Sequence, residues 1–223
     1  MPKFSFPFQF RLKTRVPTPP SELERVIDGW HHDPHSVLGA HSNETSTTFT
    51  ILRPWANSVS LVVGEDVIPM SHQMRGGWAI TIERPGITEY TLQVDYGQGV
   101  IAADDPFRFL PTIGELDLHL ISVGRHEDLW KVMGAHCKNV QGVDGVAFTV
   151  WAPSAQGVRV IGDFNMWDGV GYPMRSMGGS GIWELFVPGI GTGTKYKFNI
   201  LTQAGDWLTK SDPMAFYTEV PPA

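Results

Sequence analysis

Each half of the chain shows the same hydrophobic pattern. Apolar residues first occur at helical spacing, and apolar and polar residues then alternate. In the first half, one side of a predicted helix over residues 21–30 carries the apolar residues Leu23, Val26, Ile27 and Trp30. From residue 47 onward apolar and polar residues alternate, which predicts β-strands. We expect these strands at residues 47–52, 58–63, 78–82 and 88–95, separated by turns that contain Gly or Pro.

The second half repeats this order. A helix is expected over residues 126–133, followed by strands at residues 146–151, 158–161, 182–187 and 194–201. Residue identities are also repeated between the two halves. The repeated residues include Leu38-Gly39-Ala40-His41 and Met133-Gly134-Ala135-His136, Tyr90 and Tyr196, and Asp105-Pro106 and Asp212-Pro213. The sequence therefore predicts an all-β protein of two tandem immunoglobulin-like β-sandwich modules, each preceded by a short helix.

The predicted modules occupy residues 21–122 and 123–223, after a Pro-rich extension at residues 1–20. With 223 residues the chain is long enough for two ordinary domains. The hydrophobic fraction of 42% and the charged fraction of 18% indicate folded domains with packed cores rather than a disordered chain.

Charge and cysteine content restrict the partners and the compartment. The formal net charge of −6 and the lack of a Lys/Arg cluster argue against nucleic acid and anionic membrane surfaces as partners. No segment approaches the roughly 20 apolar residues of a membrane span. Cys137 is the only cysteine, which indicates a reducing compartment, so we expect a cytoplasmic protein. No motif for a metal or a cofactor stands out, and we expect neither.

The two copies of the module separate structural tryptophans from candidate functional ones. Trp78 and Trp183 occupy corresponding positions and are expected in the cores. Trp151 replaces a leucine of the first copy and is also expected in a core. Trp30 and Trp130 belong to the predicted helices and are expected to dock them against the sandwiches.

Trp167 and Trp207 have no counterpart in the first module, and each follows a strand of the second module; Trp55 lies in a turn and receives no prediction. On the strand at residues 194–201, Lys197 and Asn199 share the face opposite the aromatic residues and should point to solvent. Indole rings can cover the apolar face of a sugar while Lys and Asn bond its hydroxyls. Trp167, Trp207, Lys197 and Asn199 are therefore a candidate sugar-binding platform; alternatively, the two tryptophans close the ends of the sandwich.

Longer motifs show a resemblance to a known family. The segments HDPHSVLGAH, ADDPFRFLPTIGELDLHLI, LWKVMGAH and FTVWAPSAQGVRVIGDFNMWDG resemble the N-terminal region of bacterial 1,4-α-glucan branching enzymes, and the resemblance runs from about residue 21 to the end. The second module resembles the carbohydrate-binding module of glycogen-active enzymes, which also occurs in the β subunit of the AMP-activated kinase. The resemblance implies that the partner is an α-1,4-glucan such as glycogen.

The resemblance also implies which residues contact the glucan. In the kinase module these are the Trp of an FNxW loop, the Lys of YKF and the Trp after the next turn, which correspond to Trp167, Lys197 and Trp207. Asn165 in the same loop and Asn199 on the same strand complete the predicted set. The turn that carries Trp207 is longer here than in the kinase pattern.

The family's chemistry belongs to a different domain. Its retaining mechanism uses two carboxyl groups in a (β/α)₈ barrel of roughly 250 residues, and no catalytic residue can be assigned in this sequence. We therefore expect the chain alone to be inactive, with a C-terminal barrel as its missing partner domain. Two alternatives remain open: a free-standing glycogen-binding adaptor, and a tandem immunoglobulin-like interaction module with no role in sugar binding.

Overall fold

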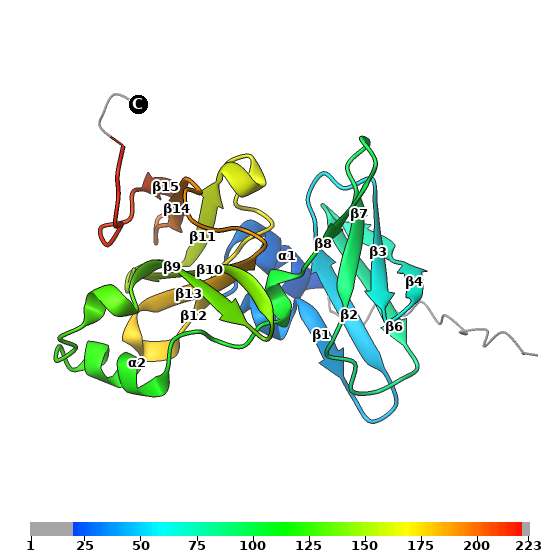
Figure 1. Ribbon diagram of the computed structural model, residues 1–223, viewed down its shortest axis with the longest axis horizontal. Helices are drawn as coiled ribbons and strands as arrows, with labels where there is room; N and C mark the ends of the chain where they lie inside the picture. Colours follow the sequence, from blue (N-terminus) through cyan, green and yellow to red (C-terminus); the bar gives the residue numbers. More distant parts are fainter. Residues whose placement is uncertain (1–19, 220–223) are drawn as a thin grey trace, which may run out of the picture.

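The computed structural model describes residues 20–219, and it consists of two β-sandwich modules that lie side by side (Figure 1). Almost all of the predicted N-terminal extension lies outside the described residues. Helix α1 (Pro20–Asp28) lies between the two modules, and helix α2 (Glu115–Ser122) follows the first module. Neither described helix is long and apolar enough to cross a membrane.

The first module consists of two four-stranded antiparallel sheets with the orders β1-β2-β6-β5 and β4-β3-β7-β8. Its strands are β1 (Gly39–Ser42), β2 (Thr47–Leu52), β3 (Ser58–Val63), β4 (Asp66–Pro69), β5 (Ser71–Met74), β6 (Gly77–Ile82), β7 (Thr91–Asp95) and β8 (Val100–Ala103). The four strands predicted from alternation are β2, β3, β6 and β7, and they are the central strands of the two sheets. The predicted all-β architecture is confirmed.

The second module packs a four-stranded sheet, β12-β13-β10-β9, against a three-stranded sheet, β11-β14-β15. Its strands are β9 (Gly134–Val140), β10 (Val143–Trp151), β11 (Gly157–Gly162), β12 (Arg175–Ser176), β13 (Ile182–Pro188), β14 (Tyr196–Leu201) and β15 (Trp207–Lys210). The predicted strands of this half correspond to β10, β11, β13 and β14. The site discussed below lies on the three-stranded sheet.

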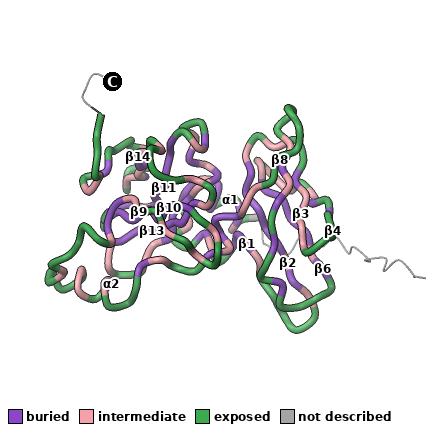
Figure 2. Tube along the Cα trace, viewed as in Figure 1, coloured by how far each residue is buried: buried purple, intermediate pink, exposed green. Residues whose placement is uncertain are grey.

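Each module has its own core, and helix α1 joins the core of the second. Phe49, Leu61 and Leu92 are fully buried between the sheets of the first module, and Phe148 and Phe198 between those of the second. Figure 2 shows this burial as two purple zones that meet near α1. Leu23, Val26 and Ile27 of the predicted apolar stripe are buried in the second of these cores, together with Leu38 and Leu52 of the first module. Trp30, the fourth residue of the predicted stripe, lies beyond the end of α1 and is 42% exposed. The helix thus fills the space between the two modules.

Corresponding contacts recur in the two modules, as the internal repeat predicts. The Tyr90 hydroxyl donates to Oδ2 of Asp105 at 2.6 Å, and the Tyr196 hydroxyl donates to Oδ2 of Asp212 at 2.5 Å. In both pairs burial is the largest cause that raises the pKa of the tyrosine, so the phenol stays protonated and donates. The repeated Tyr and Asp residues therefore have a structural role, because each pair forms a hydrogen bond within its own sandwich.

Two expectations for the second half are wrong. Residues 126–133 do not form an α-helix; they contain only a 3₁₀ turn at Leu129–Lys131, and the helix lies earlier, at Glu115–Ser122. Trp130 therefore docks no helix and is 54% exposed. Trp151 was expected in a core, but it is 61% exposed at the end of β10. Trp78 and Trp183, by contrast, are buried as predicted.

His35 gives the fold a pH-dependent stability. Its ring packs against Phe107 with 5.2 Å between ring centroids, and neither ring nitrogen has a hydrogen-bond partner among the described residues. Burial, and secondarily the positive charge of Arg175, lowers the pKa of His35 from 6.5 to about 2. The folded chain therefore keeps His35 neutral at pH values where the unfolded chain protonates it.

The free energy of unfolding should fall as the pH drops below the unfolded-state value of about 6.5, because only the unfolded chain takes up this proton. The expected slope is at most about 1.4 kcal/mol per pH unit. We expect His35→Gln to show a flatter dependence between about pH 6.5 and pH 5, measured as urea-unfolding free energies. Equal slopes for the two proteins would contradict this assignment.

Candidate carbohydrate-binding site

The loop after strand β11 carries two of the predicted site residues, Asn165 and Trp167. Asn165 is 9% exposed. Its Oδ1 accepts a hydrogen bond from the Gly162 backbone N–H at 2.8 Å, and its Nδ2 donates to the Val160 carbonyl at 3.0 Å. A buried amide that is engaged at both ends ties the loop to the strand before it. Asn165 thus shapes the loop rather than projecting from it.

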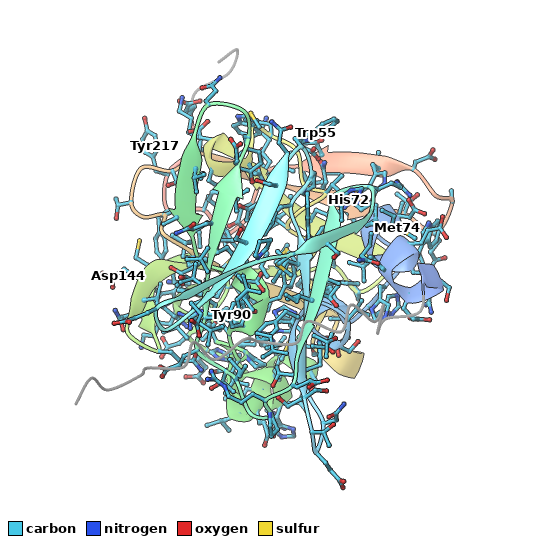
Figure 3. All side chains as sticks on the ribbon, turned by 90° about the vertical axis from the view of Figure 1, so that its right-hand side faces the viewer. Trp55, His72, Met74, Tyr90, Asp144 and Tyr217 are labelled. Atoms are coloured by element: carbon cyan, nitrogen blue, oxygen red, sulfur yellow. The ribbon has the colours of Figure 1, made fainter. Side chains whose placement is uncertain are left out.

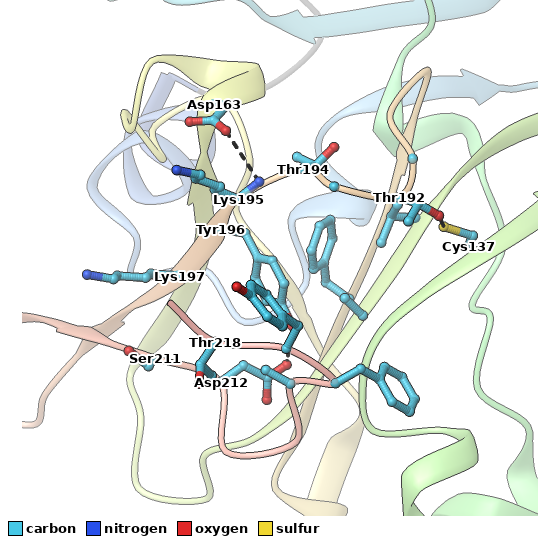
Figure 4. A pocket seen from close by; sticks show the side chains of 18 of the residues that line it. Cys137, Asp163, Thr192, Thr194, Lys195, Tyr196, Lys197, Ser211, Asp212 and Thr218 are labelled. Atoms are coloured by element: carbon cyan, nitrogen blue, oxygen red, sulfur yellow. Dashed lines mark hydrogen bonds between the residues drawn. The ribbon is translucent and has the colours of Figure 1, made fainter. Parts of the chain in front are cut away.

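Trp167 presents its ring to solvent from this loop. The backbone is left-handed at Met166 and at Trp167, with φ of 53° and 62°, a conformation that bulky residues seldom adopt. The Trp167 Nε1 donates to Oδ1 of Asp163 at 3.2 Å. The other oxygen of Asp163 accepts from the Lys195 backbone N–H, a hydrogen bond that Figure 4 shows. The indole is held by its edge, while 42% of the residue remains exposed. Such a ring is placed to cover the apolar face of a sugar.

Lys197 and Asn199 lie on the outer face of β14, as the alternation predicts. Lys197 is exposed and lines a groove of about 1060 Å³ together with Trp167. In Figure 4 the side chains of Lys195 and Lys197 extend to the same side of the strand. Asn199 is half-buried, and its Oδ1 accepts a hydrogen bond from the Thr209 hydroxyl at 2.8 Å. The polar half of the predicted platform is present on this face.

Trp207 has a different environment from Trp167. Its ring stacks on the guanidinium of Arg159, 4.1 Å from the ring centroid. The ring also lies against Gly29, directly after the end of α1. A Cβ atom at position 29 would clash with the indole. The Nη2 of Arg159 also donates to the Ile27 carbonyl at 2.5 Å. Trp207 and Arg159 together therefore attach the end of α1 to the outer face of the second module.

The structure brings Trp167 and Lys197 together and places Trp207 apart. Trp207 pairs with Leu201 across β14 and β15. Leu201 is four positions along the strand from Lys197, which corresponds to about 13 Å. The groove that Trp167 and Lys197 line does not include Trp207. The ring of Trp207 lies instead against Gly29, at the end of α1.

Trp207→Ala should therefore affect stability more than glucan binding. Removing a partly buried indole that holds a helix end is expected to lower the free energy of unfolding by about 2 kcal/mol, which a melting curve would detect. We expect the retention of this variant in a glycogen gel to equal that of the parent chain. Lost retention together with an unchanged melting temperature would instead assign Trp207 to the sugar surface.

Asp163 and Arg159 contribute to the site although the sequence reasoning did not select them. Asp163 fixes the indole of Trp167, and Arg159 positions Trp207. Burial lowers the pKa of Arg159 to about 10, while Asp168 and Asp28 partly oppose this shift, so the guanidinium remains charged at neutral pH. Asp163 lies in the loop motif, so the motif itself could have suggested it. The role of Arg159 depends on α1 packing against the second module, which no local pattern shows.

We searched the described residues for groups of side chains that could bind a metal ion. Within residues 20–219 no group of three or more His, Cys, Asp or Glu side chains is arranged so that it could hold a metal ion. The histidines near residue 35 are instead used in packing and in backbone hydrogen bonds, such as the one from His41 Nε2 to the Leu38 carbonyl at 3.0 Å.

Comparison with known proteins assigns both halves of the chain. Residues 19–107 match the family described as the N-terminal domain of the alpha-1,4-glucan branching enzyme GlgB. Residues 132–215 match carbohydrate-binding module 48, the isoamylase N-terminal domain. The groove with Trp167 and Lys197 lies in the second match.

Similar curated proteins carry the same description. The chain is 52% identical over 216 residues to the 1,4-alpha-glucan branching enzyme GlgB of Frankia casuarinae, which covers 93% of this chain and 26% of that protein. It is 50% identical over 210 residues to GlgB 2 of Streptomyces coelicolor, covering 94% of this chain and 28% of that protein. The chain thus spans little more than a quarter of the length of these relatives.

Among solved structures, the type I pullulanase of Bacillus subtilis, complexed with maltose, aligns over 78% of this chain and 24% of that chain. The sequence identity is 16% and the TM-score is 0.31, a likeness too low to bear on function. The sequence matches carry the assignment. By these matches residues 19–107 form a GlgB-type N-terminal domain and residues 132–215 form a carbohydrate-binding module 48, and the chain is similar to about a quarter of the length of GlgB proteins.

Proposed function

We propose that this chain binds α-1,4-glucan, such as glycogen, through the exposed face of its second module. The observation that carries the proposal is Trp167, whose indole is anchored by Asp163 at its edge and open to solvent on its surface. Lys197 lies beside it along the same groove and supplies a hydrogen-bond donor for sugar hydroxyls. The remaining predicted residues support this surface: Asn165 shapes the loop, Asn199 lies on the same face as Lys197, and Trp207 attaches α1.

We further propose that the glucan-binding region serves a branching enzyme whose catalytic (β/α)₈ barrel is not part of this chain. The sequence identities of 52% and 50% to two GlgB proteins support this, since those proteins are named 1,4-alpha-glucan branching enzymes. In that setting the region would act in the cytoplasm, where a chain with a single cysteine needs no disulfide. In this proposal the chain supplies glucan binding to that enzyme.

The direct test is affinity electrophoresis of the purified 223-residue chain in gels with and without glycogen. We expect the chain to be retarded by glycogen and not by dextran, whose α-1,6-linked backbone presents a different sequence of sugar faces. Open sugar sites are weak, so the dissociation constant should lie between roughly 10 μM and 1 mM. Equal mobility in all gels would overturn the proposed function and favour an interaction module with no role in sugar binding.

A further inference from the structure

Trp55 is exposed in a way that its own module does not explain. It lies in the turn between β2 and β3 of the first module and is 73% exposed. A tryptophan gains most from burying its large apolar surface, and this one leaves most of that surface in water. Its backbone is also left-handed, with φ of 67°, which is an outlier for a bulky side chain. The exposed ring and the left-handed backbone are both energetically unfavourable for a tryptophan at this position. Backbone outliers of this kind concentrate at functional sites.

The edge of the Trp55 ring is held by the second module. Its Nε1 donates to Oδ2 of Asp168 at 2.8 Å, across 113 positions of sequence. The other oxygen of Asp168 accepts from the Val170 backbone N–H at 3.0 Å, so the carboxylate is itself fixed. Gly171 of the same loop lies close to Pro54, the residue before Trp55. Figure 3 shows Trp55 at the periphery of the first module. The indole is thus oriented rather than freely rotating.

The loop that fixes Trp55 is the loop that carries Trp167. Asp168, which accepts from Trp55, directly follows Trp167 in sequence, and Met166 on its other side is 76% exposed. Both indoles are therefore presented in the same manner, with the N–H bonded to a carboxylate and much of the ring in solvent. Both also have left-handed backbones. One loop orients two exposed aromatic rings that come from different modules.

We propose that Trp55 and Trp167 contact the same α-glucan chain, so that the glucan-binding surface spans both modules. This inference rests on the proposed function and adds a residue of the first module to it. A linear polymer of identical sugars can offer the same apolar ring face to both indoles, which a short oligosaccharide cannot. The fixed orientation of both rings removes ordering cost on binding. Two tethered contacts on one chain should raise affinity with glucan length.

The test compares a short and a long glucan on the 223-residue chain by calorimetric titration with maltotriose and maltoheptaose. We expect maltoheptaose to bind more tightly. Trp55→Ala should weaken maltoheptaose binding about tenfold and leave maltotriose unchanged, whereas Trp167→Ala should weaken both. Trp55→Phe, which keeps a flat ring, should lose less than Trp55→Ala. Trp151→Ala removes an indole that is 61% exposed and lies outside the proposed surface, and it should change neither affinity.

A second measurement reads glucan binding on the parent chain alone, so it does not require any variant to bind glucan. In the parent chain, the indole N–H resonances of Trp55 and Trp167, assigned from the Phe variants, should both shift with maltoheptaose, and only that of Trp167 with maltotriose. A silent Trp55 resonance, or Trp55→Ala with parental affinity for maltoheptaose, overturns the shared surface while the proposed function stands. If neither glucan binds the parent chain, the proposed function itself fails.

Discussion

Glu184→Ala is expected to lower the free energy of unfolding by about 3–5 kcal/mol. The Glu184 side chain is fully buried, and its Oε2 accepts from Arg175 Nε at 2.8 Å. Its Oε1 accepts from both the backbone N–H and the hydroxyl of Thr112, at 3.1 and 2.8 Å. Arg175 also donates to the Phe109 carbonyl at 3.2 Å. One carboxylate thus fixes the inter-module segment to the sheet of the second module, and its removal leaves a buried guanidinium without a counter-charge.

The control for this prediction is the double variant Arg175→Met/Glu184→Leu. Replacing both charges by apolar groups removes the unpaired-charge penalty, so the double variant should be more stable than Glu184→Ala alone. Urea-unfolding curves followed by circular dichroism measure both free energies. If Glu184→Ala cost less than about 1 kcal/mol, the pair would contribute no more than a surface ion pair. A double variant less stable than the single would show that the remaining contacts of Arg175, such as its hydrogen bond to the Phe109 carbonyl, outweigh the cost of its unpaired charge.

The strands that alternation predicted are mostly central ones, and every strand that it missed is at a sheet edge. Central strands such as β2 and β13 bury apolar residues along their length, which produces a readable pattern. Edge strands have fewer neighbours and carry polar residues, as β9 does with His136 and Lys138. Their pairing is decided by the neighbouring strand rather than by their own side chains. The fold class was therefore predictable, and the complete sheets were not.

The misplaced helix has a similar cause. Helix α2 (Glu115–Ser122) buries no residue and leaves Leu116 69% exposed, so it has no apolar stripe to reveal it. Residues 126–133 have several apolar residues at helical spacing, but Leu129 and Trp130 remain exposed and the chain turns into β9 at Gly134. The Gly134 backbone, with φ of 91°, begins the strand instead of capping a helix.

Internal comparison of the two modules worked for residues within a sandwich and failed at their outer faces. Trp151 corresponds to Leu52, and both lie on the outer face of their sheet. Leu52 is completely buried because the second module covers that face of the first. No comparable neighbour covers Trp151 among the described residues, and it is 61% exposed. A repeat in sequence conveys the shared fold but not the different surroundings of each copy.

The same limit explains which of the candidate residues the sequence could place side by side. Trp167 and Lys197 meet within one module, so their motif and the strand alternation were sufficient to bring them together. Trp207 and Trp55 are defined by contacts between elements far apart in sequence, with α1 and with Asp168 respectively. Nothing in the local pattern distinguishes an indole that packs on a helix end from one that stacks on a sugar.

Trp167→Ala is expected to weaken binding to glycogen on the order of 30-fold, which corresponds to about 2 kcal/mol for the loss of a central aromatic anchor. Its indole is exposed, so the substitution should cost little stability. With a parent dissociation constant of roughly 10 μM to 1 mM, retardation of the variant in a glycogen gel should be barely measurable. Trp167→Phe, which keeps a flat ring but loses the hydrogen bond to Asp163, should fall between the two.

Two further tryptophan variants make this result interpretable. Trp151→Ala removes an exposed indole from the same module and should be retarded like the parent chain. Trp183→Ala removes a buried indole that donates to the Ala152 carbonyl at 3.0 Å, and it should unfold the second module, since such a loss costs roughly 3–5 kcal/mol. If Trp167→Ala melts like the parent and is retarded as strongly, Trp167 does not contact the glucan. Its anchored and exposed ring would then be a contact for another domain, and the groove beside Lys197 would lose its main support as a sugar site.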